Sequence, residues 1–324
     1  MAHMLIPAAL AAGLAASAAS AAGTGLVFVS NEKSSTITVL NPAHEVIETI
    51  DACGRPRGMH FAPDRKSFYV ACADDSVIAQ YDVETRKLIR RITGVAEPET
   101  FYIHPDGRHI YVSNEEDAAA TAWDLETGEQ TGFFETGEEP EGVQITPDGK
   151  LVFVASEAAN LVHVIDVDKQ EVIADIPVDN RPRRFALAQD ASELWVSAEL
   201  SGVIDLIDVT TLEVTGTIPF LPAGFRQEQV TPVDIVITAD GSRAFVALGR
   251  ANHVAVVDVP NHEVLDYMLV GSRVWGLALS ADEKTLYAAN GLSDDISIID
   301  VPSLTVTTSV PVGRVPYGIL IDDR

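Results

Sequence analysis

The sequence has little positive charge. Its 324 residues include only 22 lysines and arginines against 48 aspartates and glutamates, which gives a formal net charge of −26. Nucleic acids and anionic membrane surfaces attract basic patches, so this balance argues against both as partners. It favours cations or basic proteins instead, although much of the charge only solvates the exterior.

Cysteine is also scarce. Neither of the two residues, Cys53 and Cys72, has the spacing of a zinc site or belongs to a C-x-x-C-H haem motif. The sequence therefore predicts no zinc and no haem. Cys53 lies just before one predicted strand and Cys72 just after the next, which brings both to the same end of a sheet. A disulfide between them is predicted, and two free buried thiols are the alternative.

Helical periodicity is absent from the repeating part of the chain. A unit of 42 residues recurs instead, marked by the motif G-x-x-P-x-G. The motif proline, replaced once by valine, lies at Pro56, Pro98, Pro140, Pro182, Pro232, Val274 and Pro316. One unit contains four short runs rich in β-branched and aromatic residues, at 143–145, 151–155, 161–167 and 172–178. Four strands in a repeat of about 40–45 residues are typical of a propeller blade.

The sequence thus predicts an all-β fold, a seven-bladed β-propeller with four antiparallel strands per blade, as a single domain over residues 23–324. The domain begins with residues 26–29, which match the second strand of the unit, and ends with residues 316–321, which match the first. Pairing of these N- and C-terminal strands would close the ring and remove an exposed sheet edge.

Residues 1–22 form an alanine- and leucine-rich run that ends in small residues. This pattern predicts a secretory signal peptide, although the lysine or arginine expected before the run is missing. We expect a periplasmic protein with no membrane span in its mature form, which agrees with a disulfide.

Aspartates recur at the turns of one rim of the propeller. One set follows the first strand of the unit, at Asp64, Asp106, Asp148, Asp240 and Asp282. Because they repeat in nearly every blade, we expect their carboxylates to cap their own turn backbone.

The opposite rim, where the motif prolines lie, differs from blade to blade. The residue before the proline (the −1 position) is Arg55, Glu97, Glu139, Arg181, Thr231, Arg273 or Val315. The residue after it (the +1 position) is Arg57, Glu99, Glu141, Arg183, Val233, Trp275 or Tyr317. Binding sites of repeat folds lie where the residues vary on a constant scaffold, so this rim, the mouth of the central channel, is the candidate site.

Carboxylates are concentrated on one side of this mouth. Many oxygen ligands suit a hard cation, and the sequence predicts a site for Ca²⁺ or a lanthanide. The candidate ligands are Glu97, Glu99, Glu115, Glu139, Glu141 and Glu157. Two alternatives remain open for these glutamates. They form solvated pairs with neighbouring arginines, or they dock a basic partner.

The arginines provide another alternative. Arg55, Arg57, Arg181 and Arg183 could bind an anionic ligand bidentately, with Trp275 or Tyr317 as a stacking wall. The segment 219–230 extends its repeat by eight residues and could cover the mouth as a lid. His60, the one histidine near the mouth, is interpreted as a packed strand residue. Without a Ser/His/Asp or Cys/His arrangement, the chain is expected not to be an enzyme.

Units such as residues 151–155 followed by 162–167 resemble the YVTN-type β-propeller repeat, and the resemblance covers residues 25–323. With VSNE at 29–32 and GRVPYG at 313–318, the chain resembles the β-propeller family associated with PQQ-dependent alcohol catabolism, which is encoded with an ABC-type transport system. Related gene clusters serve lanthanide uptake. The resemblance implies an accessory role with a lanthanide as the cation, or an anion such as PQQ at the arginines. It also implies a dehydrogenase, cytochrome or transporter component as partner.

Overall fold

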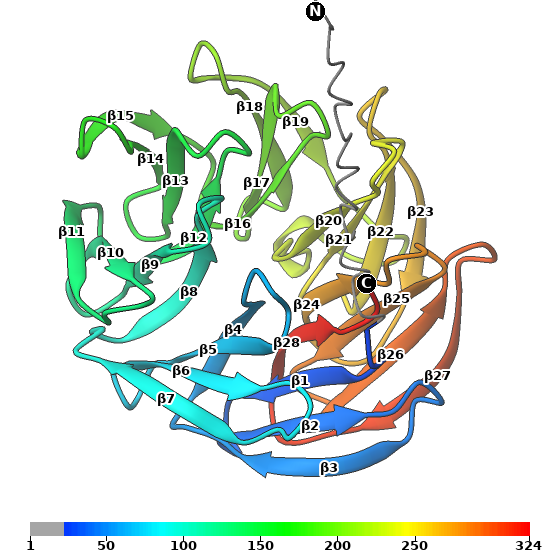
Figure 1. Ribbon diagram of the computed structural model, residues 1–324. Helices are drawn as coiled ribbons and strands as arrows, with labels where there is room; N and C mark the ends of the chain where they lie inside the picture. Colours follow the sequence, from blue (N-terminus) through cyan, green and yellow to red (C-terminus); the bar gives the residue numbers. More distant parts are fainter. Residues whose placement is uncertain (1–22) are drawn as a thin grey trace, which may run out of the picture.

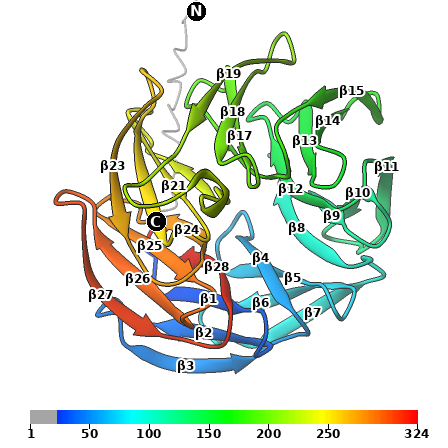
Figure 2. The same ribbon diagram turned by 180° about the vertical axis from the view of Figure 1, so that it is seen from behind.

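The protein is a closed ring of seven antiparallel sheets with four strands each, as the repeat predicted (Figures 1 and 2). The computed structural model describes residues 23–324, and the predicted signal peptide lies outside them. We number the sheets as blade 1 (β28-β1-β2-β3), blade 2 (β4–β7), blade 3 (β8–β11), blade 4 (β12–β15), blade 5 (β16–β19), blade 6 (β20–β23) and blade 7 (β24–β27).

The innermost strands are β28 (Pro316–Ile321), β4 (Pro56–Phe61), β8 (Pro98–Ile103), β12 (Pro140–Ile145), β16 (Pro182–Leu187), β20 (Ile235–Ile237) and β24 (Val274–Leu279). The second strands are β1 (Val27–Asn31), β5 (Ser67–Cys72), β9 (His109–Asn114), β13 (Leu151–Ser156), β17 (Glu193–Ala198), β21 (Arg243–Ala247) and β25 (Thr285–Asn290). The third strands are β2 (Thr36–Leu40), β6 (Val77–Asp82), β10 (Ala119–Asp124), β14 (Leu161–Asp166), β18 (Val203–Asp208), β22 (His253–Asp258) and β26 (Asp295–Asp300). The outer strands are β3 (Val46–Asp51), β7 (Leu88–Thr93), β11 (Gln130–Glu135), β15 (Glu171–Pro177), β19 (Glu213–Pro219), β23 (Glu263–Leu269) and β27 (Thr305–Pro311), and a 3-10 turn η1 spans Gln227–Gln229.

The two ends of the described chain close blade 1. Strand β28 (red in Figure 1) pairs with β1 (blue), with Val27 opposite Ile321. Asp322 fastens the pair, because one carboxylate oxygen accepts hydrogen bonds from the backbone N–H and the hydroxyl of Thr24 at 2.8 and 2.7 Å. The predicted pairing of the terminal strands is confirmed.

The hydrophobic core lies between adjacent blades. For example, Tyr111 and Ala122 of blade 3 pack with Val152 and Val154 of blade 4. Both faces of the middle strands are covered in this way, which explains their nearly continuous apolar sequences. The outer strands alternate between exposed and half-buried residues, as in β15. No helix in the described chain has the length and hydrophobicity that a membrane span requires.

Two further predictions are confirmed. Cys53 and Cys72 form a disulfide with their Cα atoms 5.6 Å apart. The turn aspartates accept hydrogen bonds from their own backbone; Asp64 Oδ1, for example, accepts the N–H of Lys66 at 3.0 Å. The same contact is made by Asp106, Asp148, Asp240 and Asp282.

The segment 219–230 packs between blades 5 and 6. Phe220 is fully buried in the core that these blades share, and Phe225 lies edge-on to His253. The side-chain amide of Gln227 donates to the carbonyl oxygen of Ser201 at 3.1 Å. These contacts brace two blades, and the role of the segment as a lid stays a prediction.

Candidate functional site

The variable positions of the repeat meet at the mouth of the channel, where the inner strands begin. The ladder between inner and second strands shifts register just after the motif proline, for example between Pro140 and Val143. Such bulges redirect side chains near functional sites. Six of the −1 residues also have φ between 33° and 65°. This left-handed backbone costs a non-glycine residue about 1–2 kcal/mol. The contacts that the charged side chains make at these positions must compensate for that strain.

At the mouth, each of the six candidate carboxylates is paired with an arginine, as in the first alternative that the sequence left open, but the inner pairs are buried rather than solvated. We call this set the ion-pair layer. It consists of Arg55, Arg57, Arg181, Arg183, Arg184 and Arg273 with Glu32, Glu97, Glu99, Glu115, Glu139, Glu141, Glu157 and Glu199.

Glu141 is the most highly connected carboxylate of the layer. Its Oε1 lies 3.6, 3.1 and 3.4 Å from nitrogens of Arg57, Arg183 and Arg184, and it accepts the hydroxyl of Tyr317 at 2.6 Å. Burial alone would raise the pKa of Glu141, but the three arginines and the tyrosine hold it well below its usual range. Burial raises the pKa of Tyr317 to about 12, so its hydroxyl stays protonated and donates.

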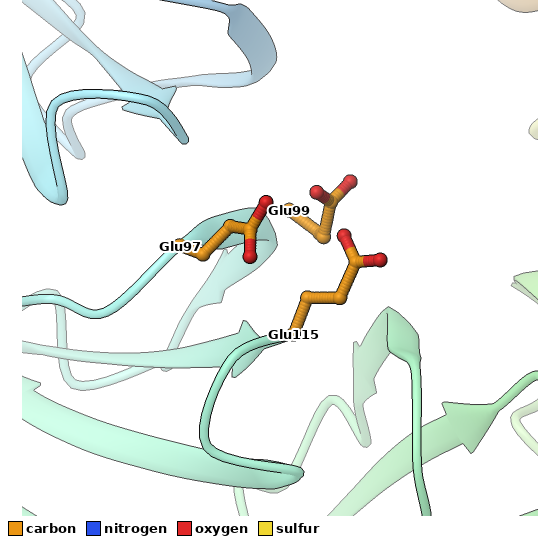
Figure 3. Close-up of side chains that lie close together, drawn as sticks. All are labelled: Glu97, Glu99 and Glu115. Carbon is orange, nitrogen blue, oxygen red and sulfur yellow. The ribbon is translucent and has the colours of Figure 1, made fainter.

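Three of the six predicted metal ligands converge. Oxygens of Glu97, Glu99 and Glu115 lie within 4.8 Å of one another, and their carboxylates point toward a common centre (Figure 3). The guanidinium of Arg55 is already bound to all three, with nitrogen–oxygen distances of 2.7, 3.0 and 3.6 Å. Glu139 stands apart, half-exposed, with its nearest ion pair to Arg181 at 3.9 Å. The trio fits a hard cation only if Arg55 moves away.

The four arginines of the predicted anion site are also occupied. Arg181 and Arg183 bind Glu157 at 2.6 and 2.8 Å, and both bind Glu199 at 3.1 Å. The aromatic wall is covered as well. The guanidinium carbon of Arg57 lies 4.4 Å from the ring centre of Tyr317, and those of Arg183 and Arg273 lie 5.0 and 4.6 Å from that of Trp275.

A central cavity of about 210 Å³ lies beneath the ion-pair layer. At about 30 Å³ per water molecule, it holds roughly seven waters or one small organic molecule. On the mouth side, Arg57, Glu99, Glu141 and Arg183 are at most 5% exposed and close the channel above it.

Three polar groups of the cavity come from the last position of the G-x-x-P-x-G motif, whose exceptions to glycine were not part of the predicted site. The second residue after the motif proline (the +2 position) is glycine in four blades and Thr100, Arg184 or Asp234 in the other three. The glycines permit close approach of neighbouring strands, since a Cβ on Gly276 would lie 2.1 Å from the carbonyl oxygen of Tyr317. The three exceptions all line the cavity.

Arg184 is the main charged group of the cavity. Its Nη2 donates to Glu141 at 3.4 Å and to the hydroxyl of Tyr317, while Nε and Nη1 donate to no group of residues 23–324. Asp234 lies in the next blade and accepts the backbone N–H of Leu277 at 2.8 Å. Burial raises the pKa of Asp234, and Arg184 opposes that shift. The cavity thus presents unused guanidinium donors beside a carboxylate.

His60 also lines this cavity, together with Tyr102 and Gln144. Its ring packs edge-on against Phe101 with 5.1 Å between ring centres, so the interpretation as a packed strand residue is correct in part. Burial, and then the positive charge of Arg184, lower the pKa of His60 to about 4. The imidazole is therefore neutral at pH 7, and one of its ring nitrogens can accept a hydrogen bond.

A pH dependence of stability follows from this depressed pKa. The unfolded chain takes up a proton on His60 near pH 6.5, whereas the folded chain does so only near pH 4. We expect this group to lower the free energy of unfolding by roughly 2–3 kcal/mol as the pH falls from 6.5 to 4. Urea unfolding at both values should show a smaller loss for His60→Gln than for the wild type. Equal losses in the two proteins would contradict this assignment.

Models of three families match parts of the chain. Residues 126–291, just over half of it, match the choice-of-anchor I domain. Residues 1–107 match the YNCE-like beta-propeller, and residues 56–173 match the seven-bladed lactonase beta-propeller. No curated protein sequence matches.

Solved structures share the fold at low sequence identity. A protein of unknown function from Desulfotomaculum acetoxidans has a TM-score of 0.78 at 15% identity, over 92% of this chain and 98% of that one. A candidate 6-phosphogluconolactonase from Bacteroides uniformis has a TM-score of 0.75 at 16% identity, over 91% and 98%. Hydrazine synthase from Kuenenia stuttgartiensis has a TM-score of 0.72 at 19% identity, over 81% and 88%.

These matches correct one expectation. The chain was expected not to be an enzyme because no nucleophile–histidine arrangement is visible in the sequence. The match of residues 56–173 to the lactonase family contradicts that expectation, and proteins named as enzymes share the fold. Catalytic arrangements are recognised by the geometry of side chains in space and not by their sequence positions, so the absence of a local motif excludes little.

Proposed function

We propose that this protein, which belongs to the choice-of-anchor I domain family, binds a small organic acid or its lactone in the central cavity and hydrolyses the lactone there. One observation carries the proposal. Arg184 replaces the glycine of the repeat and lines, with unused N–H donors, a cavity that the ion-pair layer closes on the mouth side. The lactonase match of residues 56–173 supports the reaction class.

The residues of the cavity suit this reaction. The donors of Arg184 would bind the lactone carbonyl and stabilise the oxyanion that forms on it. Neutral His60, a weak base with a pKa of about 4, would accept a hydrogen bond from the attacking water and take its proton only as the new oxygen–carbon bond forms. When the ring carbon–oxygen bond breaks, the leaving alkoxide takes that proton back from His60, whose low pKa favours the transfer. Water is the only co-reactant, and the product is the open hydroxy acid.

Lactone hydrolysis by the mature protein, followed in a pH-stat with a panel of γ- and δ-lactones, tests the proposal. Arg184→Met should lower kcat/KM by about 100-fold or more, as loss of an oxyanion donor does. His60→Gln removes the proton acceptor without disturbing an ion pair and should lower kcat more than it changes KM. Absence of hydrolysis, together with absence of binding of the hydroxy acids, would overturn the proposal.

A hard-cation site is the second candidate, and the convergence of Glu97, Glu99 and Glu115 favours it. The cation would be Ca²⁺ or a lanthanide, and the protein would then serve PQQ-dependent alcohol oxidation and transport. Calorimetric titration of La³⁺ into the wild type and into Arg55→Ala shows whether the three glutamates bind a cation or are neutralised by Arg55. Saturable binding to the wild type that Glu97→Gln weakens supports the candidate. Binding to Arg55→Ala alone means that the arginine is the permanent counter-ion.

The location and partners remain predictions. The disulfide and the sequence of residues 1–22 support a periplasmic protein. The resemblance of the repeats supports docking to a dehydrogenase, a cytochrome or a transporter component, or binding of PQQ as the organic anion. PQQ would have to reach Arg184, because the outer arginines are bound to glutamates.

A further inference from the structure

A second hollow adjoins the central cavity on the side away from the ion-pair layer. This outer chamber has a volume of about 560 Å³ and lies where the inner strands of blades 3 to 6 end in their turns. Tyr102 and Gln144 line both hollows, so they mark the passage between them. The mouth side, by contrast, is closed by charged side chains that are at most 5% exposed.

The lining of the outer chamber is unusual for so acidic a protein. Within the described chain, no charged side chain contributes to it. Its walls carry four branched aliphatic side chains, those of Ile103, Ile145, Leu187 and Ile237, beside neutral polar ones. Thr146 and Thr238 add hydroxyl groups that already bind the turn aspartates Asp148 and Asp240 at 2.7 Å. A charged ligand would find no counter-charge here, whereas an aliphatic chain would be removed from water.

From this arrangement we infer that the ligand enters from the turn side of the propeller and carries a neutral, mostly aliphatic tail. The tail lies in the outer chamber while the carboxylate or lactone head reaches Arg184. The inference rests on the proposed function, because it assigns the head group to the central cavity. It adds the route of entry and the class of ligand, which are the tail-bearing acids and lactones rather than polyhydroxylated ones.

Tail length tests the inference. Hydroxy acids with a common head and aliphatic tails of increasing length are titrated calorimetrically into the mature protein. Each methylene that enters the chamber should improve the affinity about fourfold until the chamber is full. In Ala188→Phe, which narrows the chamber from blade 5, this gain should disappear while the shortest acid still binds. Ala239→Phe, from blade 6, provides an independent obstruction should the first variant fold poorly.

Ala158→Phe is the matched control, since Ala158 is exposed on the mouth side in blade 4. It should leave the gain with tail length unchanged. A gain lost in Ala158→Phe and kept in Ala188→Phe would place entry at the mouth and overturn the inference. Equal affinity for short and long tails would overturn it too, yet leave the proposed function intact. If no acid of any length binds, both fail.

Discussion

Replacing Glu141 by glutamine is expected to lower the free energy of unfolding by about 3–5 kcal/mol. The side chain is 5% exposed and lies among the guanidinium groups of Arg57, Arg183 and Arg184. Glutamine has nearly the same shape but no charge, so the three arginines lose the carboxylate that they share, and Arg184 loses its one ion pair within the described chain. Chemical denaturation at pH 7 measures the effect.

Glu139 provides the matched control, since it lies directly before β12, the strand that contains Glu141. Its carboxylate is 46% exposed and lies 3.9 Å from Arg181, its nearest partner. Glu139→Gln should change stability by less than about 0.5 kcal/mol, as is usual for surface pairs. Because the arginines depress the pKa of Glu141, its contribution is present above pH 4.5 and is lost as the pH falls further. Similar stability of both variants would show that the layer is only surface charge.

Removal of residues 316–324 should prevent cooperative folding. The deletion takes away β28, the inner strand of blade 1, and exposes Val27, Phe28 and Val29, which are at most 1% exposed in the closed ring. It also removes Tyr317, whose hydroxyl donates to Glu141 of the ion-pair layer. We expect the loss of these contacts to exceed the free energy of unfolding of a typical domain, which is about 5–15 kcal/mol. Thermal denaturation and size-exclusion chromatography provide the measurement.

A circular permutant is the control for this deletion. It moves the chain ends to another blade but keeps β28, so the ring can still close. Residue 324 is joined to residue 23 by a short linker, which the contact between Thr24 and Asp322 makes feasible. New ends are opened between the exposed Asp168 and Lys169, in a turn of blade 4. The permutant should fold and melt cooperatively. Cooperative melting of the truncated chain near the wild-type temperature would contradict the role assigned to closure.

The fold was predictable because its determinants are local and repeated. The motif proline, replaced once by valine, and the turn aspartates return at a period of 42 residues, lengthened once to 50, and the aspartates bind backbone within their own blade. The disulfide was predictable for the same reason, as adjacent strands bring Cys53 and Cys72 together. Such features need no knowledge of how distant blades face each other.

The site was predictable only in part, because it depends on contacts across the ring. The sequence placed glutamates and arginines at the mouth, but not Arg55 among Glu97, Glu99 and Glu115. It placed His60 near the mouth, but not in one cavity with Arg184 and Asp234. A signal was present at the +2 position, where glycine is the rule and Arg184 the largest exception. Comparison of that position among blades would have indicated the cavity.

The central claim is tested most directly by a crystal structure of residues 23–324 with a hydroxy acid at saturating concentration. We predict that the carboxylate lies about 2.7–3.2 Å from Nε or Nη1 of Arg184, inside the central cavity. The same experiment with Arg184→Met should show an empty cavity. A ligand bound among Arg55, Arg57, Arg181 and Arg183 at the mouth, or no ligand at all, would contradict the central claim.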